Sequence, residues 1–138
     1  MDFQPDAAIH FAGLKSITDS LNSPMAYYRV NVSRSINLLS ALEKVNCKLF
    51  LFSSSATVYG TPLYLPIDEG HPIDTLSPYG RSKLIIEEIL KYWAKSDAQR
   101  SAIELCYFNS IGAHVPGAIG EAPQKTPNNL MPILTEVA

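Results

Sequence analysis

The chain has 138 residues, a formal net charge of −2 and 46% hydrophobic residues. A chain of this length forms one domain with a buried core, and the lack of any long basic run argues against a dedicated nucleic-acid binder. No run approaches the roughly 18 apolar residues of a membrane span, and the first residues lack the layout of a secretory signal. Cys47 and Cys106 show neither disulfide nor metal spacing, which predicts two reduced, buried thiols in a cytoplasmic protein.

Three apolar runs predict β-strands, at Ala7–Phe11, Lys48–Phe52 and Ala102–Phe108. The runs are nearly continuous rather than alternating with polar residues. This pattern is typical of parallel strands that helices cover on both faces. We therefore expect a buried parallel sheet.

Helical patterns separate the predicted strands. Two long helices are predicted to begin with an N-cap serine followed by proline, at Ser23-Pro24 and at Ser77-Pro78. Apolar residues that recur at helical spacing predict the buried side of each helix. These residues are Val32, Ile36, Leu39 and Leu42 in the first helix, and Ile85, Ile86, Ile89, Leu90 and Trp93 in the second. A last helical segment is predicted after Asn129.

The alternation of strands and helices predicts a right-handed parallel α/β sheet of the doubly wound, Rossmann type. Ligands of such sheets collect beyond the carboxyl ends of the strands. Gly13, Ser55 and Asn109 each follow a predicted strand, so we expect three segments to converge on one crevice. Residues 61–76 and 110–127 are rich in Pro and Gly and are predicted to form binding loops.

A serine cluster and a Tyr-x-x-x-Lys pattern are the most informative features of the sequence. Ser53-Ser54-Ser55 follows the second predicted strand, and Tyr79 and Lys83 lie four residues apart on one face of the second long helix. A lysine ammonium favours the ionised form of a neighbouring phenol, which can then take a proton from a substrate hydroxyl. A nearby serine hydroxyl would orient the same substrate oxygen. Together these residues predict a hydride-transfer site.

Other polar residues have simpler interpretations. The three histidines share no metal-ligand spacing, so no metal site is predicted, and His10 is interpreted as an interior residue with a hydrogen-bond partner. Glu87-Glu88 is interpreted as a solvated helix face. Taken alone, Tyr79 and Lys83 also fit an ordinary exposed helix start, and Asn128-Asn129 also fits an N-cap pair.

Several segments of the chain match a known family. They are His10–Lys15, Phe52–Gly60, Ser77–Lys83, Tyr107–Asn109, Gly112–His114, Ile119–Glu121 and Pro127–Pro132. Together they resemble the extended short-chain dehydrogenase/reductase superfamily, and within it the UDP-glucose 4-epimerase family. The resemblance covers nearly the whole chain, and the first two segments are the most specific.

The resemblance implies an NAD-dependent interconversion of UDP-glucose and UDP-galactose through a 4-keto intermediate, a step of galactose metabolism. It implies that Tyr79 deprotonates the sugar 4-hydroxyl, that Lys83 assists it and binds the nicotinamide ribose, and that Ser55 bonds the 4-oxygen. The implied NAD-binding residues are Phe11, Ala12, Gly13, Lys15, Asn31, Ser53, Tyr79, Lys83 and Tyr107. The implied substrate-binding residues are Ser55, Ala56, Thr57, Tyr107, Phe108, Asn109, Asn128, Asn129 and Leu130.

The Gly-rich turn that binds the cofactor pyrophosphate in this superfamily has no counterpart, since no glycine precedes Gly13. The resemblance therefore implies that residues 1–138 are an incomplete NAD-binding Rossmann-type domain, whose strands correspond to strands 4, 5 and 6. It also implies that the substrate-binding segment begins within residues 110–138. We expect the first strand to be an open sheet edge and the isolated chain to be inactive.

The resemblance further implies a UDP-sugar as binding partner and a homodimer contact through helices 24–45 and 78–95. Charge and hydropathy predict no nucleic-acid or membrane partner. Two alternatives remain open. The chain could be a non-catalytic, truncated product that acts as a piece of a dimer interface. It could also belong to another nucleotide-sugar epimerase or to a dehydratase.

Overall fold

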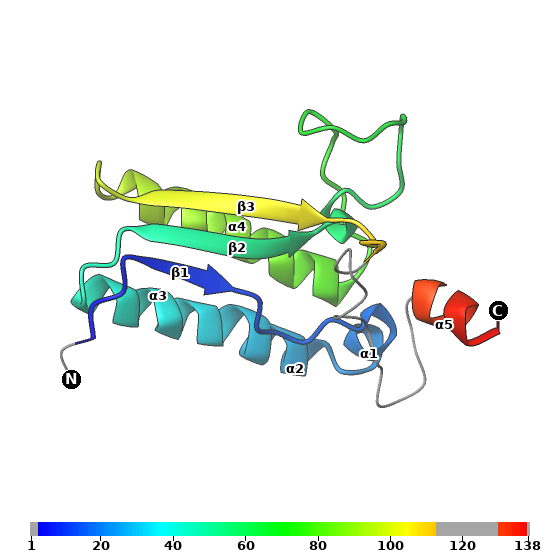
Figure 1. The fold of residues 1–138 in the computed structure, drawn as a ribbon, viewed down its shortest axis with the longest axis horizontal. Helices are drawn as coiled ribbons and strands as arrows, with labels where there is room; N and C mark the ends of the chain where they lie inside the picture. The colour runs from blue at the N-terminus through cyan, green and yellow to red at the C-terminus, as the bar shows by residue number, and fades with distance from the viewer. Residues whose placement is uncertain (1–2, 113–129, 138) are drawn as a thin grey trace. The chain divides into compact units, whose positions relative to one another are not determined.

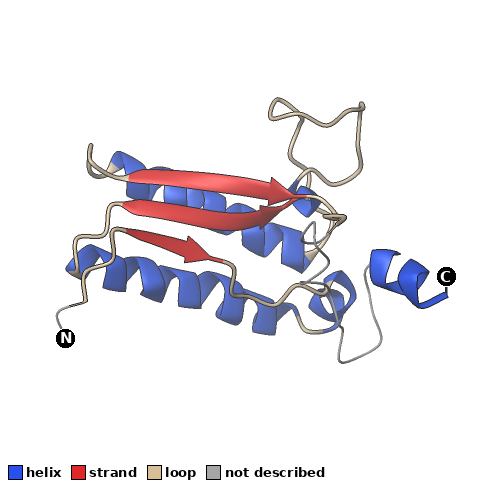
Figure 2. Cartoon of the chain, viewed as in Figure 1, coloured by secondary structure: helices blue, strands red, loops and turns tan. Residues whose placement is uncertain are grey.

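The computed structural model describes residues 3–112 and 130–137, which contain one parallel β-sheet (Figure 1). The strands are β1 (Ala7–His10), β2 (Leu49–Ser55) and β3 (Ser101–Tyr107), in the order β1-β2-β3. Figure 2 shows that all three run in the same direction. The α/β fold class predicted from the sequence is confirmed. By its internal contacts the chain divides into two compact units, Met1–Cys106 and Tyr107–Ala138.

The strands lie close to their predicted positions, with one informative difference. Ala7 pairs with Leu49 and His10 pairs with Phe52 in the parallel ladder of β1 and β2. β2 does not end at Phe52 but continues through the serine cluster to Ser55, whose backbone is still extended (φ −154°, ψ 145°). The serines are therefore held by the sheet itself. Within the described residues, β1 is an edge strand, as predicted.

The helical segments are more numerous than the sequence predicts. The second long helix is confirmed as α4, and the segment after Asn129 as α5. The first long helix is divided, because residues 28–33 form a π-helix between two α-helical parts. The segments are α1 (Ile17–Asn22), α2 (Pro24–Tyr27), the π-helix η1 (Tyr28–Ser33), α3 (Arg34–Lys44), the 3₁₀ turn η2 (Ala56–Val58), α4 (Pro78–Lys95) and α5 (Leu130–Val137). The short helix α1 was not predicted.

The side of the first long helix that faces the sheet differs from the prediction at one position. Leu39 and Leu42 are buried as predicted, but Ile36 is 43% exposed and Ser35 is buried instead. The Ser35 hydroxyl donates to the Asn31 carbonyl oxygen at 2.5 Å and bonds His10 Nε2 at 2.8 Å. The residue that faces the buried histidine of β1 is therefore a serine, which can form a hydrogen bond with the imidazole. The wider π-helical turn before α3 also changes which residues face the sheet.

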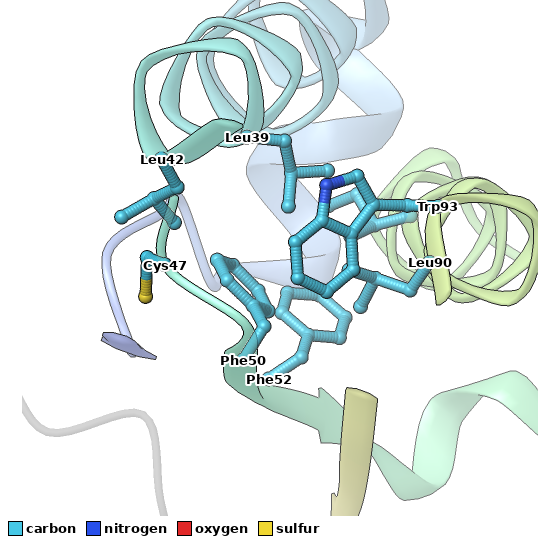
Figure 3. Close-up of a cluster of buried hydrophobic side chains, with 8 residues drawn as sticks. Leu39, Leu42, Cys47, Phe50, Phe52, Leu90 and Trp93 are labelled. Carbon is cyan, nitrogen blue, oxygen red and sulfur yellow. The ribbon is translucent and has the colours of Figure 1, made fainter. Parts of the chain in front are cut away.

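The main core lies between one face of the sheet and the helices α3 and α4. Figure 3 shows Phe50 and Phe52 of β2 close to Leu39 of α3 and Trp93 of α4. The rings of Phe50 and Trp93 meet edge to face, with their centroids 6.2 Å apart. Each such side chain contributes about 1.5–3 kcal/mol when fully buried. The buried members are Leu39, Leu42, Cys47, Phe50, Phe52, Ile86, Leu90 and Trp93.

The other face of the sheet is open in the described part of the chain. Ile9 of β1 is 63% exposed, and Ile103 and Leu105 of β3 are 45% and 38% exposed. On β2, Phe50 and Phe52 are buried while Leu49 and Leu51 are only half-buried. In the described part of the chain helices cover one face of the sheet, and coverage of the other face stays a prediction. Apolar runs show that a face is suited to burial, but not that another element covers it.

The loop between η2 and α4 has a defined structure that closes back on itself. Gly60 adopts φ +66°, and a Cβ atom added there would lie 1.8 Å from the Asp74 carbonyl oxygen. His71 is buried and bonds the loop at two points. Its Nε2 accepts from the Leu63 N–H at 3.0 Å, and its Nδ1 donates to the Pro72 carbonyl oxygen at 2.8 Å. These contacts fix the loop that leads to the Tyr-x-x-x-Lys helix.

None of the helices among the described residues is long and apolar enough to cross a membrane. The same part of the chain also contains no group of three or more His, Cys, Asp or Glu side chains that could hold a metal ion.

Candidate active site

The serine cluster occupies the carboxyl end of β2, where its side chains alternate between the two faces of the sheet. Ser54 is 3% exposed and lies on the helix side, whereas Ser53 and Ser55 are half-buried. Ser55 is also the N-cap of η2. Its Oγ accepts hydrogen bonds from the Thr57 backbone N–H at 3.3 Å and the Thr57 hydroxyl at 3.1 Å. These bonds fix the Ser55 oxygen and leave its own proton to donate.

The start of α4 brings Tyr79 next to this strand end. Ser77 caps the helix by accepting from the Gly80 N–H at 3.1 Å, and Pro78 occupies the first helical position. A Cβ atom added to Gly80 would lie 2.9 Å from the Thr57 carbonyl oxygen. The backbone of α4 therefore packs directly against η2. Only glycine permits this approach between the tyrosine segment and the residues that follow the serines.

Lys83 is buried at the junction between α4 and β2. Its side chain is 6% exposed, and its Nζ donates a hydrogen bond to the Ser53 carbonyl oxygen at 2.7 Å. Nζ lies 4.8 Å from the centroid of the Phe52 ring and 5.9 Å from that of Tyr79. Desolvation lowers the pKa of Lys83 from 10.5 to about 8, although the carboxylate of Glu87 opposes the shift.

Tyr79 is also buried, with 8% of its surface exposed. Its ring meets the Tyr27 ring edge to face, with a centroid separation of 6.4 Å. The Lys83 ammonium lies on the same helix face, with its Nζ 5.9 Å from the centroid of the Tyr79 ring. The predicted convergence of the serine cluster, Tyr79 and Lys83 on one end of β2 is present in the structure. The alternative of an ordinary exposed helix start does not fit the burial of these two side chains.

A buried amide connects the turn after β1 to the same helix. Asn31 Oδ1 accepts from the Leu14 N–H at 2.8 Å, and Asn31 Nδ2 donates to the Leu14 carbonyl oxygen and the Ser82 hydroxyl, both at 3.0 Å. Ser82 in turn donates to the Tyr79 carbonyl oxygen at 2.7 Å. Asn31 is 2% exposed, so its amide is engaged within the protein. Its assignment to NAD binding is a prediction that this geometry does not test.

The other residues predicted to bind NAD after the first strand lie in the turn that Asn31 holds. Phe11, Ala12, Gly13 and Lys15 are all exposed, and Phe11 is exposed to 62%. They follow the carboxyl end of β1, next to the carboxyl end of β2 where the serine cluster lies. The structure therefore places them at the edge of the sheet that the prediction requires.

The residues predicted for the substrate side are divided among three parts of the chain. Ala56 and Thr57 form η2, next to Ser55. Four others belong to the second compact unit, where all of them are exposed: Tyr107, Phe108, Asn109 and Leu130. Asn128 and Asn129 lie outside the described residues. For these six residues, the assignment to substrate binding stays a prediction.

The structure corrects the interpretation of Glu87. This residue was assigned to a solvated helix face, but it is 4% exposed and accepts a hydrogen bond from the Ser54 hydroxyl. The sequence does contain a signal for its position. Glu87 follows Tyr79 by eight residues and Lys83 by four, so it lies on the same helix face. Tyr27, which packs against Tyr79, was also missed.

The histidine and cysteine predictions have different outcomes. His10 is buried and bonded to Ser35, as predicted. Burial lowers its pKa, and the positive charge of Lys83 lowers it further, so the imidazole is neutral. Both cysteines are free thiols, but only Cys47 is fully buried, and Cys106 is half-buried. Burial, followed by the negative charge of Glu87, raises the pKa of the Cys106 thiol.

Comparison with known proteins identifies the family. The family model described as "NAD dependent epimerase/dehydratase family" matches residues 1–137. The chain belongs to this family. A curated epimerase/dehydratase relative, the UDP-glucose 4-epimerase of Mus musculus, is 51% identical over 133 residues. The match covers 96% of this chain but 38% of the relative, so the chain spans well under half the length of the curated proteins it resembles.

Solved structures of epimerase/dehydratase proteins have the same fold. The UDP-glucose 4-epimerase of Bifidobacterium longum, in complex with NAD⁺ and UDP, is 46% identical and has a TM-score of 0.89. That of Stenotrophomonas maltophila, with bound NAD and formylated UDP-arabinopyranose, is 43% identical and also has a TM-score of 0.89. Both matches cover 96% of this chain, and they cover 40% and 39% of the respective structures. NAD is thus the cofactor of the family.

Proposed function

We propose that this chain carries the catalytic residues of an NAD-dependent UDP-glucose 4-epimerase, which interconverts UDP-glucose and UDP-galactose. One observation carries the proposal: Ser55, Tyr79 and Lys83 converge at the carboxyl end of β2. The identity of about half of all residues to UDP-glucose 4-epimerases supports it. A buried tyrosine–lysine pair beside a fixed serine oxygen is suited to moving a proton on and off a hydroxyl.

Each of the three residues has a distinct task in this proposal. Tyr79, as the phenolate, takes the proton of the sugar 4-hydroxyl and later returns it. Lys83 provides the positive charge that stabilises the phenolate. Ser55, whose oxygen Thr57 holds in place, donates a hydrogen bond to the sugar 4-oxygen. Bound NAD would supply the hydride chemistry that these side chains lack.

The residues present fit a nicotinamide cofactor. An ammonium has three N–H donors, and the bond to the Ser53 carbonyl oxygen uses one of them, so Lys83 retains donors for ribose hydroxyls. The exposed turn from Phe11 to Lys15 provides an aromatic ring, a backbone segment without a side chain at Gly13, and a cation. All three lie at the same end of the sheet. We propose that this turn, Asn31, Ser53 and Tyr107 border the cofactor, and that residues 1–138 form part of its binding domain.

We assign the substrate side to residues that follow β2 and β3. Ala56 and Thr57 adjoin Ser55 and would contact the sugar. Tyr107, Phe108 and Asn109, together with residues 128–130, would contact the nucleotide sugar, and the substrate-binding segment would begin within residues 110–138. Amide side chains such as Asn109 suit this role because they donate hydrogen bonds to anionic oxygens.

We also infer a homodimer formed through helices 24–45 and 78–95. Exposed apolar side chains on these helices support it, since Met25, Ile36 and Tyr92 are 73%, 43% and 76% exposed. We place the protein in the cytoplasm, which the two free cysteines support.

A segment exchange tests the proposed function directly. The 133-residue segment of the mouse UDP-glucose 4-epimerase that matches this chain is replaced by the matching residues of the chain. We expect the chimaera to retain bound NAD, detected by absorbance and fluorescence, and to convert UDP-galactose to UDP-glucose. In the same chimaera, Tyr79→Phe is expected to lower kcat by about 100-fold or more, because general-base catalysis is lost.

Two controls complete this experiment. Tyr92→Phe removes a hydroxyl from an exposed tyrosine of the same helix and is expected to leave kcat unchanged. The isolated chain, assayed in parallel, is expected to be inactive. A folded, NAD-loaded chimaera without turnover would show that these residues do not form the proposed site.

A further inference from the structure

Glu87 is a buried acidic residue that the proposed chemistry does not use. It lies on α4 and is 4% exposed, although a carboxylate is rarely buried without partners. Its Oε1 accepts hydrogen bonds from the Ser54 hydroxyl and, at 3.9 Å, from the Cys106 thiol. One side chain thus connects α4 to both β2 and β3.

The position of Ser54 makes this connection important for the site. Ser54 lies between Ser53, whose carbonyl oxygen accepts from Lys83, and Ser55, whose hydroxyl belongs to the proposed catalytic set. The bond from Ser54 to Glu87 therefore anchors the strand end on which both neighbours depend. Because strand side chains alternate, anchoring Ser54 on the helix face fixes Ser53 and Ser55 on the other face.

Glu87 also lies one helical turn beyond Lys83, and Lys83 lies one turn beyond Tyr79. The three charged or ionisable groups follow one another along a single face of α4. Burial disfavours the ammonium form of Lys83, and the carboxylate of Glu87 favours it. Tyr79 on the same helix and His10 on β1 also lie near Lys83, whose positive charge lowers the pKa of His10. The imidazole of His10 is neutral and provides no counter-charge.

We propose that Glu87 is a positioning residue of this site, which fixes the β2 terminus through Ser54 and keeps Lys83 protonated as its buried counter-charge. The role of Glu87 in catalysis rests on the proposed function, whereas the titration of Lys83 that tests this inference requires neither substrate nor cofactor. Glu87 touches neither substrate nor cofactor in this arrangement. It acts through Lys83 and the serine strand.

Glu87 also acts on titratable groups of β3 and of the segment after β2. Burial and the negative charge of Glu87 raise the pKa values of Glu104 and Cys106, and Tyr59 has its pKa raised to about 12 by burial, Cys106 and Glu87. Lys83 is the buried cation on the same helix face as Glu87, and Lys91 acts on Glu104 instead. Removal of the Glu87 charge should therefore lower the pKa of Lys83 and also lower those of Glu104, Cys106 and Tyr59.

The test measures the titration of Lys83 by NMR of its side-chain ammonium, without any ligand. Glu87→Gln preserves the size of the side chain and its ability to accept from Ser54, but removes the charge. We expect the pKa of Lys83, about 8 in the parent chain, to fall by about one unit. Glu88→Gln makes the same change at the exposed neighbouring position and is expected to leave Lys83 unchanged.

Ser54→Ala separates the two roles, because it removes the anchor and keeps the charge. We expect it to leave the Lys83 titration nearly unchanged and to shift the backbone amide resonances of Ser53 and Ser55. Glu87→Asp restores a carboxylate and is expected to return the Lys83 pKa toward the parent value, which also covers the case in which Glu87→Gln does not fold.

An unchanged Lys83 titration in folded Glu87→Gln would overturn the proposal. Loss of the fold in both Glu87→Gln and Glu87→Asp would also overturn it, because Glu87 would then be a general packing residue. Neither result depends on NAD or UDP-sugar binding. A chimaera that fails to turn over UDP-galactose would instead count against the proposed function and would leave these titrations interpretable.

Discussion

At the scale of single residues, the proposed chemistry depends on a lysine that is difficult to bury. Lys83 is 6% exposed, close to two aromatic rings, and bonded to the Ser53 carbonyl oxygen. Desolvation brings its pKa down to about 8, within reach of physiological pH. A group whose pKa lies near the pH of the solution changes its protonation in response to small changes in nearby charge. This property explains why the buried carboxylate of Glu87 matters at a distance from the substrate.

The depressed pKa of Lys83 predicts a pH-dependent stability. The folded chain releases this proton at about pH 8, whereas the unfolded chain retains it up to the ordinary value of 10.5. Between these values the unfolded state binds more protons, so the free energy of unfolding rises with pH. The contribution of Lys83 should rise by about 2 kcal/mol between about pH 7 and pH 9.5. Urea unfolding at the two pH values measures it.

Lys83→Met isolates this effect, because the variant lacks the titrating group but has a side chain of similar length. Other groups, such as Cys106 and Tyr59, titrate in both proteins and cancel in the difference. The gain in stability with pH should be smaller in Lys83→Met than in the parent by about 2 kcal/mol. Equal pH slopes in the two proteins would mean that Lys83 keeps an ordinary pKa.

At the scale of elements, the site depends on how closely α4 approaches η2. The contact is possible because Gly80 has no side chain, and the N-cap Ser77 sets the position at which the helix begins. Tyr79 lies between these two residues. Its position relative to Ser55 is thus set by a backbone contact and a cap rather than by its own hydrogen bonds.

Gly80→Ala is therefore expected to destabilise the fold, although alanine is the better helix former. The new Cβ would meet the Thr57 carbonyl oxygen at 2.9 Å, and that oxygen belongs to rigid backbone. Overpacking of this kind costs about 1–3 kcal/mol, which exceeds the propensity gain of at most about 1 kcal/mol. Urea unfolding should show a net loss of about 1–2 kcal/mol.

Ser40→Ala is the matched control, since Ser40 is an exposed position of α3 where alanine meets no backbone. Its effect should be neutral or stabilising by a few tenths of a kcal/mol. A Gly80→Ala protein as stable as Ser40→Ala would show that α4 can move away from η2 without loss.

At the scale of the whole molecule, the described sheet has one covered face and one open face. Ile9 and Ile103 are exposed on the open face, and the edge of β1 has backbone groups that β2 does not pair. Exposed apolar sheet surface and open edges promote association between chains. We expect the isolated chain to associate as its concentration increases, as light scattering can measure.

Lysine substitutions on this face should reduce the association. The double variant Ile9→Lys and Ile103→Lys places charges on the open face and is expected to scatter less light than the parent at equal concentration. Leu63→Lys is the control, because Leu63 is 74% exposed but lies in the loop before α4. If Leu63→Lys reduced association and the double variant did not, the loop rather than the sheet would mediate it.

Local periodicity and spacing were enough to predict the strands, the N-cap of α4 and the site motif. Apolar runs indicated all three strands, and Ser77-Pro78 indicated the start of α4. The four-residue spacing of Tyr79 and Lys83 placed both on one helix face. Similarity over nearly the whole chain then specified the family, which the comparisons confirm.

Which polar groups are buried, and which apolar groups are not, is visible in the folded chain but not in the sequence pattern. Glu87 bonds Ser54 because β2 extends through the serines. Ser35 instead of Ile36 faces the sheet, where its hydroxyl forms a hydrogen bond with the buried His10. The open face of the sheet follows from the absence of a covering element among the described residues. Burial and charge depend on residues far apart in sequence, which no local pattern contains. The charge state of Lys83, on which the proposed chemistry depends, is set by such long-range contacts, which bury its side chain.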